Sequence, residues 1–346
     1  MSREEPRFAW WIVRWALLAL AIPGASQSAL ADAPRLGPFE LPKPRELTIF
    51  RDDQAFNPFE ALNGSYATAA SCATVPHGLW IDIDGKGDCI RYYPQALAEG
   101  ENRTVLVYFG GDVMLRNSKG VRFITDSYLR QSPATIAAEM ADWARQAGRP
   151  AIFMARPGIY GSSGDHNKRR HPREIVLMDR ALDQIKQEHK ISTFILVGHS
   201  AGGQIVAGLL SRRSDVSAAV ISSGLVSVKQ VSAYWERRRR VSGKLLYNAA
   251  EFYDPVDEID RIPTAHRPDI YVLSNPEDRT VPFFSQLLYV RRLRVAGFEP
   301  HHIYVQATDR QRHLLAYHGS TSNVPERETK SWPWCAGGQA RLMSHN

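Results

Sequence analysis

The sequence has little of several features that mark particular classes of protein. Three cysteines in 346 residues are too few for a disulfide-rich scaffold. Charge of one sign does not dominate, since 43 Lys and Arg face 36 Asp and Glu, so we expect no nucleic-acid partner. No segment recurs with a period of about 20–50 residues, which argues against a propeller or a solenoid. Hydrophobic residues make up 44% of the chain, which excludes a wholly disordered protein.

A membrane-spanning apolar run is also missing near the N-terminus. The uninterrupted apolar run after three early arginines, Trp15 to Ile22, is far shorter than the ~20 residues that span a bilayer. Pro23 follows it, and Ala29-Leu30-Ala31 has the small-x-small pattern of a cleavage site. We interpret residues 1–31 as a signal peptide cut after Ala31, and predict a periplasmic or secreted protein. An uncleaved membrane anchor is the alternative.

Export would place the cysteines in an oxidising compartment. Cys72 and Cys89 are close in sequence, and a bridge that closes a loop of this length stabilises a protein by roughly 3 kcal/mol. We predict this bridge, which leaves Cys335 of the segment SWPWC unpaired. The alternative is three unpaired cysteines that act as small apolar residues.

From residue 78 onward, strand-like and helix-like segments alternate. Apolar runs predict strands at 78–83, 89–94, 103–109, 151–156, 193–199, 216–224, 269–275 and 302–307. Apolar residues at helical spacing predict helices from Pro133, Pro172, Ala201 and Pro282. The alternation predicts an α/β fold, with a mostly parallel sheet covered by helices on both faces.

The remaining segments lack this rhythm. Residues 32–77 are rich in Pro, Gly and Asn, so we expect an irregular N-terminal lead-in. Residues 225–267 interrupt the alternation, and we expect them to form a small lid. Residues 320–346 show no periodicity and are interpreted as a C-terminal tail.

One motif carries chemistry. Gly198-His199-Ser200-Ala201-Gly202 fits G-x-S-x-G and stands between an apolar strand and a helix start. A sharp turn at this place lifts the serine oxygen out of the backbone. The backbone N–H of Ala201 would then lie at a helix N-terminus, where it stabilises an oxyanion. The alternative is a tight turn with an inert serine.

With this motif in this place, the chain resembles an α/β-hydrolase over about residues 78–319. In that family an acid and then a histidine follow the serine along the chain. The loop after the strand at 269–275 offers Asp278, with Glu277 as the alternative, and an ordinary helix-capping carboxylate is also possible.

The segment after the last strand offers His313, with His318 as the alternative. The resemblance implies that His313 takes the proton of Ser200 and that Asp278 orients the imidazole. No cofactor and no metal is implied, because such a triad needs none.

The second oxyanion donor is expected in the loop Phe109-Gly110-Gly111-Asp112. Family members often have His-Gly-Gly here, so Phe109 is a departure. We expect Gly111 to donate, with Gly110 and Asp112 as neighbouring alternatives. A tight turn without a catalytic role remains possible.

Two polar segments have plainer interpretations. The loop that begins at Arg156 resembles the Arg-x-Gly-x-Gly-x-Ser loop of the family. Its Asp165, His166 and His171 lack the spacing of metal ligands, so we expect a solvated loop. The run Glu236 to Arg240 is interpreted as a solvated helix face. The alternative is a basic rim, Arg237–Arg240, that contacts anionic substrates or lipid headgroups.

The resemblance implies an exported serine hydrolase that cleaves an ester or another acyl bond in a small molecule or a peptide. Tyr253-Asp254-Pro255 and the acid loop are similar to the prolyl oligopeptidase-like and dienelactone-hydrolase-like branches. A serine peptidase is therefore the alternative. It would lack a propeller, since about 45 mature residues before the strand at 78–83 are too few for one. A non-catalytic binding protein on the same scaffold is a third possibility.

Overall fold

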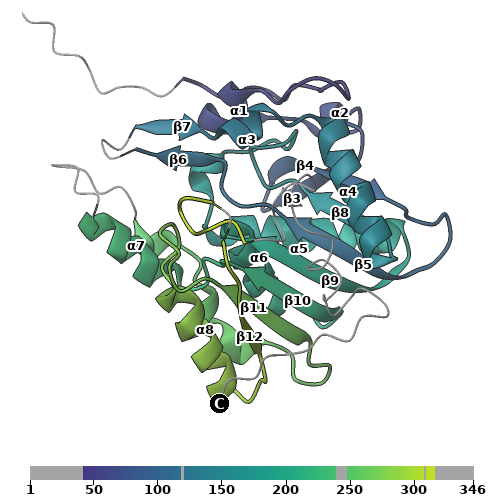
Figure 1. Ribbon diagram of the computed structural model, residues 1–346. Helices are drawn as coiled ribbons and strands as arrows, with labels where there is room; N and C mark the ends of the chain where they lie inside the picture. Colours follow the sequence, from purple (N-terminus) through teal and green to yellow (C-terminus); the bar gives the residue numbers. More distant parts are fainter. Residues whose placement is uncertain (1–41, 118–120, 239–247, 308, 316–346) are drawn as a thin grey trace, which may run out of the picture. The chain divides into compact units, whose positions relative to one another are not determined.

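One eight-stranded sheet organises the residues that the computed structural model describes, 42–117, 121–238, 248–307 and 309–315 (Figure 1). The strands follow in the order β12 (His301–Tyr304), β11 (Asp269–Ser274), β10 (Val216–Ser222), β9 (Ile191–His199), β5 (Asn102–Phe109), β8 (Ala151–Met154), β4 (Lys86–Gln95) and β3 (Gly78–Ile83). β4 runs antiparallel to both of its neighbours, and the other neighbouring pairs are parallel. The predicted mostly parallel sheet is confirmed.

The sheet has its switch point at β5. The chain leaves β5, passes through a helix to β8 on one side, and then returns through another helix to β9 on the other side. The loops that follow β5 and β9 therefore lie side by side at the carboxyl edge of the sheet. In open α/β sheets this is the place where ligands bind.

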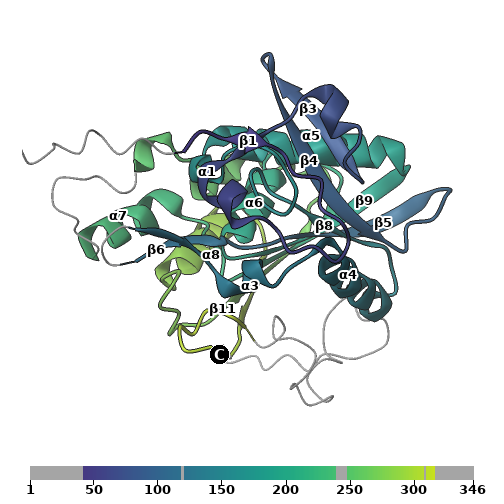
Figure 2. The same cartoon turned by 90° about the horizontal axis from the view of Figure 1, so that it is seen from above.

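Helices cover both faces of the sheet, as predicted (Figure 2). The buried side chains of α4 (Pro133–Ala147) pack on one face. The other face is covered by α5 (Pro172–Glu188), α6 (Ala201–Leu210) and α8 (Phe284–Val295). The strands supply apolar side chains alternately to the two layers, which is why their sequences are apolar almost throughout.

β3 and β4, which coincide with the strands predicted at 78–83 and 89–94, form a hairpin. Asp84 and Gly85 both have positive φ, 53° and 74°, which a two-residue hairpin turn requires. The predicted disulfide is also confirmed, because Cys72 and Cys89 are bonded. The bond joins the short helix α2 (Ala69–Cys72) to β4.

The lead-in is more regular than expected. It contains the parallel pair β1 (Arg45–Glu46) and β2 (Ser65–Tyr66) and the helix α1 (Pro58–Asn63). α1 forms because the side chain of Asn57 caps its N-terminus and Pro58 occupies its first turn. Phe56, next to this cap, is buried in the apolar layer on the α4 side.

A second hairpin was not predicted from the sequence. β6 (Met114–Arg116) and β7 (Arg122–Ile124) pair antiparallel, and α3 (Asp126–Leu129) follows them. The strands have three residues each, too few for a period-two pattern to stand out.

The expected lid contains α7 (Val228–Arg238) and three short 3₁₀ turns, η2 (Ala249–Glu251), η3 (Pro255–Asp257) and η4 (Ile259–Arg261). Apolar side chains of α7 pack against Val281, just after the expected acid. A further 3₁₀ turn, η1 (His166–Lys168), follows β8.

Several predictions concern segments outside the described residues. These are the signal peptide, the C-terminal tail with Cys335, and Arg239 and Arg240 of the basic run. Arg237 and Arg238 are exposed at the end of α7, and the basic rim stays a prediction. Among the residues with described positions, no helix is long and apolar enough to span a bilayer.

Candidate active site

Ser200 occupies a sharp turn between β9 and α6. Its backbone has φ 56° and ψ −116°, a conformation that non-glycine residues rarely adopt. The flanking glycines make this turn possible. A Cβ atom at Gly198 would lie 2.3 Å from the carbonyl oxygen of Gly202, and a Cβ at Gly202 would lie 2.0 Å from that of Phe109. Ser200 itself is half-buried, so solvent reaches it.

The loop after β5 lies against this turn. A Cβ atom at Gly111 would lie 3.2 Å from the Cβ of Ser200, a tight contact, so the loop and the turn approach each other closely at this glycine. Ala201 is the first residue of α6, where backbone N–H groups are left without intrahelical partners. The structure therefore brings both expected oxyanion donors, Ala201 and Gly111, next to Ser200.

Asp278 and His313 are hydrogen-bonded to each other. Nδ1 of His313 lies 2.7 Å from Oδ2 of Asp278, whose side chain is only 1% exposed. The other carboxylate oxygen accepts the backbone N–H groups of Thr280 and Val281, at 2.8 and 2.9 Å. An ionised carboxylate can only accept, so Nδ1 of His313 carries the proton and Nε2 is left as the basic nitrogen.

The position of His313 is fixed from several sides. Its backbone N–H donates to Asp309, and its carbonyl oxygen accepts the hydroxyl of Ser223. Its ring lies 4.7 Å, centroid to centroid, from the ring of His199, the residue before Ser200. The expected base therefore lies beside the turn that carries the expected nucleophile.

The alternative site residues are placed differently. The carboxylate of Glu277 lies 3.5 Å from Arg312, and both side chains are largely exposed. Glu277 is thus paired with Arg312, whereas His313 is paired with Asp278. His318 lies outside the described residues, so the choice between it and His313 as the base stays a prediction.

A buried cluster of charges lies behind the loop after β5. The carboxylate of Asp112 accepts hydrogen bonds from Arg156, Arg169 and Arg170. Burial by itself would raise the pKa of this carboxyl, but the three guanidinium groups outweigh it and hold the pKa well below its usual range. No pattern in the sequence predicted this cluster. The available signal was the group of arginines in the loop that begins at Arg156.

His166 corrects one prediction. It was expected in a solvated loop, yet it is completely buried. Its Nδ1 lies 3.2 Å from the carbonyl oxygen of Pro157, and Arg156 and Arg169 are close by. Burial and these positive charges lower the pKa of His166 well below its usual value, so the ring is neutral at pH 7. Within the described part of the chain, no group of three or more His, Cys, Asp or Glu could hold a metal ion.

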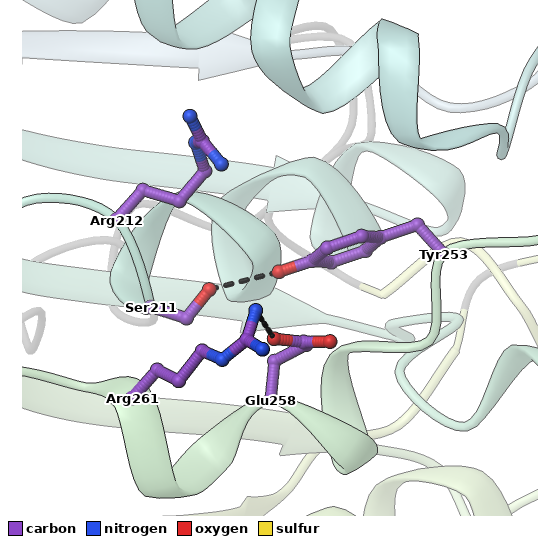
Figure 3. A pocket seen from close by; sticks show the side chains of 5 residues that line it. All are labelled: Ser211, Arg212, Tyr253, Glu258 and Arg261. Atoms are coloured by element: carbon purple, nitrogen blue, oxygen red, sulfur yellow. Dashed lines mark hydrogen bonds and ion pairs between the residues drawn. The ribbon is translucent and has the colours of Figure 1, made fainter.

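Two surface pockets lie away from Ser200. One of about 280 Å³ is lined by Ser211, Arg212, Tyr253, Glu258 and Arg261 (Figure 3). Ser211 follows the C-terminus of α6, whereas Ser200 precedes its N-terminus. The polar groups of this pocket already pair with each other, Ser211 with Tyr253 at 2.8 Å and Glu258 with Arg261 at 2.7 Å. A second pocket of about 540 Å³ lies along the C-terminal half of α4. Neither pocket includes an expected site residue.

Part of the chain is similar to a known hydrolase family. Residues 139–277 match the model of a hydrolase family described as serine aminopeptidase, S33. A search of curated proteins found no match. Similar solved structures include acylaminoacyl peptidase from Pyrococcus horikoshii, 14% identical, with a TM-score of 0.44 over 66% of this chain and 36% of that one.

Two smaller proteins are also similar. An esterase from Pyrococcus furiosus is 12% identical, with a TM-score of 0.47 over 72% of this chain and 90% of that one. Est1E from Butyrivibrio proteoclasticus, solved with ferulic acid, is 13% identical, with a TM-score of 0.48 over 69% and 92%. The chain thus spans little more than a third of the length of the acylaminoacyl peptidase, and most of the length of the two others.

Proposed function

We propose that this chain is an exported serine hydrolase of the α/β-hydrolase fold, which its strand order and the family model matched by residues 139–277 support. It cleaves an ester or a similar acyl bond through an acyl-enzyme on Ser200. One observation carries the proposal. The buried 2.7 Å contact between Asp278 and His313 lies at the same edge of the sheet as the strained turn of Ser200.

The proposed reaction uses groups of the chain alone. Nε2 of His313 takes the proton of the Ser200 hydroxyl as the oxygen attacks the acyl carbonyl. His313 then protonates the leaving group, and later activates the water that hydrolyses the acyl-enzyme. Asp278 keeps the proton on Nδ1 and stabilises the charged imidazole. The N–H groups of Ala201 and Gly111 stabilise the oxyanion, and loss of one such donor costs about 3 kcal/mol.

Three described carboxylates near the site are not available to the amino terminus of a peptide, and this favours an ester substrate. Binding a substrate ammonium group requires an available carboxylate. Asp112, Glu174 and Asp278 are each already paired, with three arginines, with Arg156 and with His313. A serine peptidase is the second candidate, because the matched family model is described as an aminopeptidase.

Export is part of the proposal. The disulfide between Cys72 and Cys89 supports it, because such bonds persist in oxidising compartments. Intact mass of the protein recovered from a bacterial periplasm tests it. A chain that begins at Asp32 is expected, and an unprocessed chain would contradict cleavage after Ala31.

Labelling with a fluorophosphonate, read by intact mass, tests the chemistry. We expect one adduct on the native protein and none on Ser200→Ala. Asp278→Asn is expected to slow labelling by several orders of magnitude, since an amide NH₂ group that faces Nδ1 of His313 donates and so favours the wrong tautomer of the imidazole. Glu277→Gln, the matched control in the same loop, is expected to label at the native rate.

The result also separates the classes of function. A folded native protein that forms no adduct would contradict the hydrolase proposal and favour a binding protein on this scaffold. If labelling succeeds, turnover of short esters against that of peptides and aminoacyl amides chooses between esterase and peptidase.

A further inference from the structure

The peptide bond between Gly110 and Gly111 is held in place by a buried arginine, Arg156. Nη1 of Arg156 donates to the carbonyl oxygen of Gly110 at 3.4 Å. In a trans peptide the C=O and the following N–H point in opposite directions. A guanidinium group that fixes the carbonyl of Gly110 therefore also fixes the direction of the N–H of Gly111, which points away from Arg156.

Arg156 can serve as a fixed support because it is itself immobilised. Its side chain is 1% exposed and lies between two carboxylates. Nε donates to Glu174 of α5 at 2.8 Å, and Nη1 donates to Asp112 at 3.1 Å. The second oxygen of Glu174 accepts the backbone N–H of Arg170, so Glu174 is held as well.

The other side of Gly111 is held by the same cluster. Asp112 follows Gly111 directly, and Arg169 and Arg170 donate to its Oδ2 atom. Arg169 also donates to the carbonyl oxygens of His166 and Met114. Together with the bonds to Asp112, these bonds connect the loop after β5 to the loop after β8. Gly111 is thus fixed through the residue before it and the residue after it.

The cluster also has a surplus of positive charge. Three guanidinium groups face the two carboxylates of Asp112 and Glu174, and all five side chains are less than a tenth exposed. Fixed positive charge in a place that water does not reach favours negative charge that develops nearby.

We propose that Arg156 is a positioning residue for the oxyanion hole. Arg156 fixes the direction of the N–H of Gly111 through the carbonyl of Gly110 and the carboxylate of Asp112. This inference rests on the proposed function. Arg156 does not touch the substrate. It removes the freedom of the loop to rotate this peptide, so that the donor is in place before the oxyanion forms.

The test compares arginines in two buried clusters. Arg156→Met and Arg156→Lys change the proposed support, and Lys keeps the charge but cannot bridge Glu174 and Gly110 at once. Arg213→Met is the matched control. Arg213 is 5% exposed and pairs with Asp179, Asp183 and Asp215, but it follows the far end of α6. Thermal melting reports the loss of stability, and an ester assay normalised to folded protein reports kcat and KM.

We expect all three variants to melt at a lower temperature. Only the two Arg156 variants are expected to lose kcat, by about tenfold or more with KM changed less than about threefold, since loss of a whole donor costs about 10²- to 10³-fold. Fluorophosphonate labelling of Ser200 is expected to slow in parallel. If Arg156→Met does not fold, Arg156→Lys decides the question.

The outcomes separate the two levels of the proposal. Native kcat in folded Arg156→Lys, with Ser200 still labelled, would overturn the positioning role alone. An equal loss of kcat in Arg213→Met would also overturn it, because the effect would then follow stability and not the loop. A native protein that is not labelled at Ser200 would refute the proposed function itself.

Discussion

The strained backbone of Ser200 leads to a prediction about stability. An alanine variant is usually more stable than a glycine variant at the same position, and we expect the reverse at Ser200. At φ 56° and ψ −116°, a residue with a Cβ atom is strained, whereas glycine adopts this conformation freely. Ser200→Ala keeps the strain and Ser200→Gly releases it. We therefore expect Ser200→Gly to be the more stable of the two, although both abolish labelling.

The size of the effect follows from two opposing contributions. Strain at such a position costs about 1–3 kcal/mol. Glycine in place of alanine makes the unfolded chain more flexible, which lowers the free energy of unfolding by about 0.4–1 kcal/mol. The difference leaves Ser200→Gly ahead by about 1 kcal/mol, which corresponds to a rise of roughly 2 °C in Tm relative to Ser200→Ala.

Ser211 offers the matched control. It lies at the C-terminus of α6 with φ −76° and ψ −4°, where a Cβ atom causes no strain. At this position the Gly variant should be less stable than the Ala variant. Urea unfolding of the four variants measures both differences. If Ser200→Ala equals or exceeds Ser200→Gly in stability, the turn stores no strain and the reasoning is refuted.

Three further predictions follow from the packing, the disulfide and the buried histidine. Gly202→Ala is expected to lower the free energy of unfolding by more than about 2 kcal/mol and to slow labelling, since its Cβ would meet backbone atoms of the loop after β5. Gly100→Ala, with no atom within 4 Å of the added Cβ, should leave both measurements nearly unchanged. Replacing both Cys72 and Cys89 with Ser should cost about 3 kcal/mol in urea unfolding, and an unchanged midpoint would show that the bridge is absent. Because the pKa of His166 is lower in the folded than in the unfolded protein, stability should decline as the pH falls below about 6.5, by up to about 1.4 kcal/mol per pH unit. His166→Gln should reduce this slope in unfolding measured from pH 7.5 to 5, and an unchanged slope would contradict the assignment.

The fold was accessible from the sequence because its signals are local. A strand buried on both faces is a continuous apolar run, and the predicted strands coincide with the sheet to within a few residues at each end. The two ends of α4 are also marked by local sequence signals. Ser132 caps its start, and Gly148 ends it in a left-handed conformation. The short elements between residues 42 and 77 and the hairpin β6–β7 were missed, because two- and three-residue strands carry no readable period.

In the candidate site, too, one part could be predicted from local sequence and another could not. The turn at Ser200 could be predicted because the residues that shape it, Gly198 and Gly202, lie only two positions away in the sequence. The adjacent acids Asp278 and Glu277 could not be distinguished in this way. Their difference is that one side chain faces His313 and the other faces Arg312, and this depends on how two distant loops meet.

The sequence by itself thus determined the α/β layering and the sharp turn at Ser200, since each depends on residues near one another in the chain. Tertiary structure alone decided which carboxylate lies against His313 and that His166 is buried. It alone also gathered the arginines around Asp112. Those arginines are 44, 57 and 58 residues away from Asp112, and no local pattern records a contact over such a separation. Their meeting depends on the crossover that brings the loops after β5 and β8 to the same edge of the sheet.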